Sequence, residues 1–235
     1  MIRLLVALLL LFAAAPDTLV TGAWAQSCRL PERVESRACA AQGPARGTPG
    51  QFDYYVLALS WSPGFCADAG RARANRLQCA DNNFGFVLHG LWPQYRGATK
   101  GEPAWPQYCR RVEALPDALL RRHLCQQPSA VLMNCEWAKH GTCTGLDAEG
   151  YFAAAERLMQ RLQLPDLRRG EQQVGDLIKA IQAVNTGIKP EHIAVIVRDG
   201  ALSEVRLCYS RNLTEYVACD PAVGGSRPSR RLRVQ

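Results

Sequence analysis

Ten cysteines constrain this 235-residue chain more than any other feature of its sequence. All ten follow the first 25 residues and their number is even, as is typical of exported proteins whose cysteines form disulfides in an oxidising compartment. We therefore expect five disulfides among Cys28, Cys39, Cys66, Cys79, Cys109, Cys125, Cys135, Cys143, Cys208 and Cys219. Proximity along the chain favours Cys28–Cys39, Cys66–Cys79 and Cys208–Cys219. No C-x-x-C pair occurs, which argues against a structural zinc site.

The N-terminus has the pattern of a secretory signal peptide. Arg3 precedes an apolar run over residues 4–15, which is too short to span a bilayer. Residues 23–25 (AWA) then match an A-x-A cleavage site, so we predict that residues 1–25 are removed. The alternative is a buried N-terminal helix. No later segment has 18 uncharged apolar residues in a row, so we expect an exported protein without a membrane span, in the periplasm or outside the cell.

The composition is that of a globular protein. Hydrophobic residues make up 48% and charged residues 21%, which excludes a disordered chain, a collagen and a coiled-coil rod. The formal net charge is +7, and a basic surface can attract nucleic acid, anionic lipid or acidic polysaccharide. The alternative is a solvated basic surface with no fixed partner.

Residue patterns predict an α+β domain over residues 51–220, with a central antiparallel sheet and helices packed on it. We expect strands at residues 52–61, 84–88, 193–197 and 202–208, and helices at 110–124, 151–162 and 172–184. We expect turns or loops at residues 62–64, 71–83 and 90–106, an irregular leader at 26–50 and a basic flexible tail at 221–235. The Asp199-Gly200 dipeptide between the last two strands is typical of a type I′ hairpin.

The segment FVLHGLWP at residues 86–93 is the first that indicates chemistry. Its apolar strand is expected to end at His89, and a strand end is a rigid mount for a side chain. Gly90 allows another group to approach the backbone closely. The alternative is a histidine with a structural role only.

The segment CEWAKHGTC at residues 135–143 is the second segment that indicates chemistry. In a helix, Glu136, Lys139 and His140 would lie on one face, one turn apart. Gly141 suits the end of such a helix, and a bridged Cys143 would clamp it. The alternative is a surface pair of Glu136 with Lys139 or His140, worth only a few tenths of a kcal/mol.

Together these side chains suit in-line displacement at phosphorus in RNA, where the 2′-hydroxyl is the nucleophile. One imidazole can remove the 2′-hydroxyl proton and the other can protonate the leaving 5′-oxygen, because the pKa of imidazole lies near neutrality. Lys139, and Glu136 when protonated, could stabilise the charge that develops on the phosphorus oxygens. Such a site predicts a bell-shaped pH–rate profile and needs no metal or other cofactor.

Both segments resemble the ribonuclease T2 family of secreted endoribonucleases. FVLHGLWP matches the family pattern F-x-x-H-G-L-W-P, and EWAKHGTC at residues 136–143 matches E-W-x-K-H-G-T-C. The segment LALSWSPGFC at residues 57–66 is similar to the first strand and turn of bacterial members. The similarity extends from about residue 52 to residue 219, which is most of the mature chain.

The resemblance implies metal-independent cleavage of single-stranded RNA through 2′,3′-cyclic phosphates, which are hydrolysed later to 3′-phosphates. It implies His89 as general acid, His140 as general base, and Glu136 and Lys139 as stabilisers of the pentacovalent phosphorus. Trp92 resembles the tryptophan that contacts a base in the family, and stacking would suit an unpaired base. The alternative for Trp92 is a packed core side chain.

The resemblance also implies a Cys109–Cys143 bridge, which leaves Cys125 to pair with Cys135. Many family members have a phosphate-binding histidine directly before the glutamate, where this chain has Cys135. A sulfur atom cannot replace a cationic imidazole, so binding of phosphate is expected to be weaker unless an arginine compensates. The other two histidines, His123 and His192, match no family block and are expected to be structural or surface residues.

Two further hypotheses remain beside the endoribonuclease. The first is a non-catalytic cationic binder of RNA or anionic surfaces, for which Cys135 is the only support. The second is a metallohydrolase that uses His89, His140 and Glu136, which the lack of an H-E-x-x-H or C-x-x-C pattern makes weak. For the endoribonuclease we expect single-stranded RNA as the partner, no obligate protein partner and a monomer.

Overall fold

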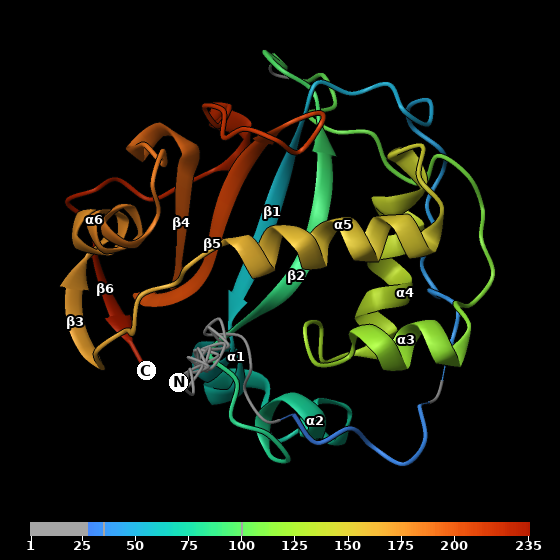
Figure 1. Ribbon diagram of the computed structural model, residues 1–235, viewed down its shortest axis with the longest axis horizontal. Helices are drawn as coiled ribbons and strands as arrows, with labels where there is room; N and C mark the ends of the chain where they lie inside the picture. The colour runs from blue at the N-terminus through green and yellow to red at the C-terminus, as the bar shows by residue number, and fades with distance from the viewer. Residues whose placement is uncertain (1–27, 35, 100) are drawn as a thin grey trace, which may run out of the picture.

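The computed structural model describes residues 28–34, 36–99 and 101–235 (Figure 1). The predicted signal peptide lies outside the described residues. The centre of the molecule is a six-stranded sheet in the order β2-β1-β5-β6-β3, with β4 paired to β5. Its strands are β1 (Tyr54–Trp61), β2 (Phe86–Gln94), β3 (Gly170–Gln173), β4 (Ile193–Arg198), β5 (Ala201–Ser210) and β6 (Arg231–Val234). The pairs are antiparallel apart from β5 with β6, so the predicted α+β class is confirmed.

Helices pack around this sheet, and α5 crosses one face of it (Figure 1). The helices are α1 (Ser62–Ala69), α2 (Arg76–Cys79), α3 (Asp117–His123), α4 (Ala130–Lys139), α5 (Ala148–Arg161) and α6 (Val174–Val184). Short 3-10 turns lie at Arg73–Asn75, Gly141–Cys143, Pro190–His192 and Pro221–Val223. The buried side of α5 includes Tyr151, Phe152 and Leu158, which join the sheet in one hydrophobic core. No helix among the described residues is long and apolar enough to cross a membrane.

Several local predictions are confirmed and others are wrong. The hairpin between β4 and β5 has positive φ at Asp199 and Gly200, as a type I′ turn requires. The turn expected at residues 62–64 is instead the start of α1, because a proline fits the first turn of a helix. The helix expected at 110–124 begins only at Asp117, directly after Pro116, and residues 71–83 contain the short helix α2 rather than only a loop.

Strand β2 is longer than predicted, and His89 lies in its middle rather than at its end. The expected loop at residues 90–106 therefore begins only after Gln94. A proline is tolerated in β2 because β2 is an edge strand of the sheet, with a neighbouring strand on one side only.

A β-bulge occurs in β2 at His89. The pairing register with β1 shifts between Ala58 and Leu59, which leaves His89 without an opposite residue in the described ladder. Bulges of this kind change the direction of side chains and are common beside functional sites. Here the shift allows Leu88 and Leu91 both to pack in the main core, although they are three positions apart.

Five disulfides form, but two of the predicted pairs are wrong. Cys66–Cys79 and Cys208–Cys219 are present, as proximity along the chain favoured, and so is Cys109–Cys143. Instead of Cys28–Cys39 and Cys125–Cys135, the structure has Cys28–Cys125 and Cys39–Cys135. The N-terminal leader runs along α3 and α4, so each of its cysteines lies closer to a distant partner than to the other (Figure 1).

The predicted basic tail, residues 221–235, contains a strand that the sequence patterns did not indicate. Residues Arg231–Val234 form β6, which pairs with β3. The segment alternates strictly, so Leu232 and Val234 are buried while the arginines between them are exposed. Burial of these two side chains stabilises the strand despite its high charge.

Candidate active site

Helix α4 brings three polar side chains to one cavity. Its N-terminus is capped by Ser129, whose hydroxyl accepts a backbone N–H of the first turn. Glu136, Lys139 and His140 line a cavity of about 250 Å³, as expected for positions i, i+3 and i+4 of one face. Trp137 packs on the other side of the helix in the core. The helical spacing predicted from the sequence is therefore present.

Strand β2 brings His89 and Trp92 to the same cavity. Trp92 donates a hydrogen bond from Nε1 to Oε2 of Glu136, at 2.6 Å. Its ring lies between the two imidazoles, with ring centroids 5.0 Å from His89 and 5.4 Å from His140. Trp92 is half-buried, so it is both a packing residue that holds Glu136 and a surface of the cavity.

Gly90, in β2, lies directly against the side chain of Glu136 from α4. A Cβ atom at Gly90 would lie 2.0 Å from Oε2 of Glu136 and 2.5 Å from Nε1 of Trp92. These two atoms are the donor and the acceptor of the hydrogen bond between Trp92 and Glu136, so a side chain at this position would disturb it. The close approach expected at this glycine is therefore that of the Glu136 carboxylate.

His89 lies between two carboxylates. Its Nδ1 is 2.7 Å from Oε1 of Glu204, and its Nε2 is 3.7 Å from Oε1 of Glu136. Gln127 donates a hydrogen bond to the backbone carbonyl of His89. Burial lowers the pKa of His89, but the hydrogen bond to Glu204 and the charges of both carboxylates outweigh burial and raise it above 6.5.

The surroundings of His140 shift its pKa in the opposite direction. Its side chain is buried, and no group among the described residues forms a hydrogen bond with its Nδ1. Burial, followed by the positive charges of Lys139 and His89, lowers the pKa of His140 well below 6.5. Burial also raises the pKa of Glu136, against the effects of His89, Trp92 and Lys139.

Three residues of this site were not predicted from the sequence. Glu204 contacts His89, Arg206 lines the cavity and lies over the Trp92 ring, and Trp105 also lines the cavity with 37% of its surface exposed. The sequence did contain an indication of Glu204 and Arg206, because both are charged residues inside the strand expected at residues 202–208. Charged side chains are rarely buried unless they are paired. Trp105 had no comparable signal, because it lies in an irregular segment rich in glycine and proline.

The remaining candidates lie elsewhere or have other contacts. Cys135 is bonded to Cys39 and so braces α4 next to Glu136. His123 pairs with Glu156 at 3.2 Å, His192 stacks on Tyr216, and neither lines the cavity. No group of three or more His, Cys, Asp or Glu side chains in the described chain is arranged to hold a metal ion.

Comparison with known proteins identifies relatives for most of the chain. A family model described as the ribonuclease T2 family matches residues 52–219. A probable ribonuclease of Haemophilus influenzae is 42% identical over 123 residues, which cover 48% of this chain and 44% of that protein. A ribonuclease of Aeromonas hydrophila is 43% identical over 121 residues, which cover 52% and 51%. The matches thus span about half the length of these curated relatives.

Solved structures share the fold. RNase NT in complex with 5′-AMP aligns with a TM-score of 0.59 and 24% identity, over 78% of this chain and 98% of that one. Trichomaglin, described as an S-like ribonuclease, aligns with a TM-score of 0.62 and 21% identity, over 78% and 97%. At these identities the likeness supports the fold alone.

Proposed function

Because the chain belongs to the ribonuclease T2 family, we propose that it is an endoribonuclease that cleaves single-stranded RNA without a metal ion. The observation that supports this most is that His89 and His140, from two distant segments, line one cavity and have pKa values shifted in opposite directions. Environments that separate two pKa values are typical of an acid and base pair. The raised value suits the acid and the lowered value suits the base.

In the proposed reaction, neutral His140 accepts the proton of the 2′-hydroxyl. The 2′-oxygen forms a bond to phosphorus, and the bond from phosphorus to the 5′-oxygen breaks. Protonated His89 donates its proton to the leaving 5′-oxygen, which yields a 2′,3′-cyclic phosphate and a free 5′-hydroxyl. Hydrolysis of the cyclic phosphate to a 3′-phosphate would reuse the two side chains in exchanged roles.

Glu136 and Lys139 are the proposed stabilisers of the phosphorus oxygens. Both line the cavity, and Lys139 adds a fixed positive charge beside His140. Because burial raises the pKa of Glu136, this carboxyl takes up a proton more readily than an exposed one and can then donate a hydrogen bond to phosphate.

We propose single-stranded RNA as the substrate because Trp92 and Trp105 line the cavity, and unpaired bases stack on aromatic rings. The net charge of +7 would attract the phosphate backbone. Five disulfides agree with an oxidising compartment such as the periplasm or the exterior of the cell. A monomer without an obligate protein partner remains a prediction.

Digestion of a defined single-stranded RNA tests this function against the two other hypotheses. The full chain is incubated with the RNA in EDTA from pH 4 to pH 8, and the product ends are identified by mass spectrometry. We expect cyclic phosphate and 3′-phosphate ends. Retention of bound but intact RNA at every pH would favour the cationic binder, and loss of cleavage on chelation would favour a metallohydrolase.

A further inference from the structure

A buried ion-pair chain lies behind His89. Glu204, on β5, is 3% exposed, and both of its carboxylate oxygens are engaged. Oε1 lies 2.7 Å from Nδ1 of His89. Oε2 accepts two hydrogen bonds from Arg206, at 2.9 Å from Nε and 2.7 Å from Nη2. A carboxylate bound on both sides in this way has little freedom to turn.

Arg206 is itself held in place. Its Nη1 donates to the backbone carbonyl of Val223, and its guanidinium lies 5.0 Å from the centre of the Trp92 ring. The guanidinium is therefore anchored on one side by the backbone and on the other by an aromatic face. This fixes the position of Glu204 relative to Trp92, which in turn binds Glu136.

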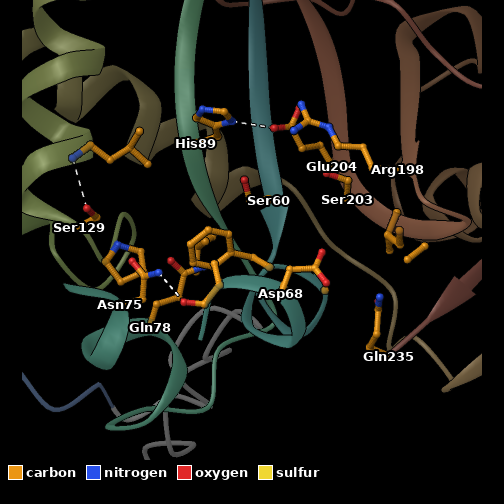
Figure 2. A pocket seen from close by; sticks show the side chains of 18 of the residues that line it. Ser60, Asp68, Asn75, Gln78, His89, Ser129, Arg198, Ser203, Glu204 and Gln235 are labelled. Carbon is orange, nitrogen blue, oxygen red and sulfur yellow. Dashed lines mark hydrogen bonds and ion pairs between the residues drawn. The ribbon is translucent and has the colours of Figure 1, made fainter. Parts of the chain in front are cut away.

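The contact between His89 and Glu204 spans a strand, since β1 lies between β2 and β5 in the sheet. The β1 residues opposite Glu204 and Arg206 are Ser60 and Ala58, both of which are small. Together with the bulge at His89, these small residues allow side chains of β2 and β5 to meet above β1. Figure 2 shows His89 and Glu204 joined across the strand, with Ser60 beneath them.

We infer that Glu204, held by Arg206, is a positioning residue for His89, and that it keeps Nδ1 as a hydrogen-bond donor and directs Nε2 to the leaving oxygen. The inference rests on the proposed function. The hydrogen bond at one ring nitrogen determines which nitrogen is free to exchange a proton. With Nδ1 bound to Glu204, Nε2 is the atom on the side of Glu136, which lines the cavity.

The charges that face His89 come from two elements. Glu204 and Arg206 belong to β5, while Glu136 and the neighbouring His140 belong to α4 and its C-terminal cap. Glu204 and Glu136 favour protonated His89, whereas Arg206 opposes it. Burial alone would raise the pKa of Glu204, but contacts with His89 and Arg206 lower it to about 2, so Glu204 is ionised wherever His89 titrates.

The first experiment replaces Glu204 by glutamine, which removes the charge and nearly preserves the shape. For Glu204→Gln we expect kcat to fall on the order of 10- to 100-fold, with little change in KM. We also expect the alkaline limb of the pH–rate profile to move to lower pH, because His89 loses the carboxylate that favours its protonated form. The acidic limb, which we attribute to His140, should stay in place.

Glu171→Gln is the matched control. Glu171 also pairs with an arginine, Arg231, but the pair is exposed and lies on the edge strand β3 at the far end of the sheet from β2. We expect this variant to keep the kcat and the pH profile of the original protein. An unchanged kcat and alkaline limb in folded Glu204→Gln would overturn the inference while leaving the proposed function intact.

A second measurement needs no variant, so it remains decisive even if Glu204→Gln fails to fold. The ¹⁵N chemical shifts of the His89 ring are recorded in the unaltered protein above its pKa. We expect neutral His89 to hold its proton on Nδ1, and a proton on Nε2 would overturn the inference. The tautomer is independent of RNA cleavage, so an inactive protein would contradict the proposed function without deciding this point.

Discussion

The two histidines of the site are the same side chain in opposite surroundings. His89 lies on an edge strand, has 28% of its side chain exposed and faces two carboxylates. His140 caps a helix and is 5% exposed, and the charged groups among the described residues that shift its pKa are Lys139 and His89, both of which lower it. The difference shows that the groups packed around a histidine determine the direction of its pKa shift. Here the sheet edge provides one of the two surroundings and the end of the helix provides the other.

The two sides of the cavity also differ in the contacts that form them. The His140 side of the cavity comes from one helical turn, in which Glu136, Lys139 and His140 are close in sequence. The His89 side depends on a bulge in β2 and on partners from β5, across the strand between them. The His140 side therefore depends on local geometry and the His89 side on strand pairing.

The largest effect should come from removing the proposed base. We expect His140→Ala to reduce the rate of RNA cleavage by about 10²- to 10⁴-fold, which is typical for loss of a general base. Rates are measured on a defined RNA, with circular dichroism and thiol titration as controls for the fold and the disulfides. A near-normal rate would contradict the role of His140 and the contrast between the two histidines.

A larger side chain at Gly90, where β2 contacts Glu136, should reduce activity nearly as much. In Gly90→Ala the new methyl group would overlap the Glu136 carboxylate, so we expect a loss of about 1–3 kcal/mol in unfolding free energy and a large fall in kcat. Denaturant unfolding and cleavage assays measure both. If stability and activity are unchanged, the close approach of Glu136 to β2 is not important for the site.

Weakening the support of α4 should affect stability more than chemistry. The double variant Cys39→Ala with Cys135→Ala removes the bridge beside Glu136 and leaves the His89 side untouched. We expect a loss of about 2–4 kcal/mol in unfolding free energy, with cleavage retained at temperatures where the protein is folded. Complete loss of cleavage in the folded variant would show that this bridge positions Glu136 and His140.

The pH–rate profile tests the comparison without any substitution. In the proposed mechanism, cleavage requires neutral His140 and protonated His89. Because burial lowers the pKa of His140, the acidic limb should lie below pH 6.5, and because the carboxylates raise the pKa of His89, the alkaline limb should lie above it. kcat/KM, whose pH dependence reports the pKa values of the free protein, is measured from pH 4 to pH 8, and limbs that both lie on one side of pH 6.5 would contradict the assigned surroundings.

The smallest effects concern stability as a function of pH, and their signs should be opposite. The lowered pKa of His140 gives stability that is present above pH 6.5 and is lost as the pH falls, so His140→Gln should reduce the drop in Tm between pH 7.5 and pH 5. The raised pKa of His89 gives stability that is lost as the pH rises, so His89→Gln should enlarge that drop. Thermal unfolding of both variants beside the original protein measures the two differences, and equal signs would refute the comparison.

Much of the fold and one side of the site could be predicted from the sequence. The spacing of Glu136, Lys139 and His140 was sufficient because a helix has a fixed number of residues per turn. The same is true of the hairpin at Asp199-Gly200, since few residue pairs tolerate two positive φ angles. Local backbone geometry was enough in both cases.

The His89 side of the cavity could not be predicted in this way, because it depends on how distant segments pack together. The bulge at His89, the contact with Glu204 and the pairing of Cys28 with Cys125 join positions that are distant along the chain. No local pattern specifies which strand register or which cysteine becomes the neighbour, because these depend on how the whole chain packs around its core. The proposed catalytic side chains and the helical spacing of three of them could be predicted from the sequence, whereas the pKa shift of each histidine depends on burial and on neighbours that only folding brings together.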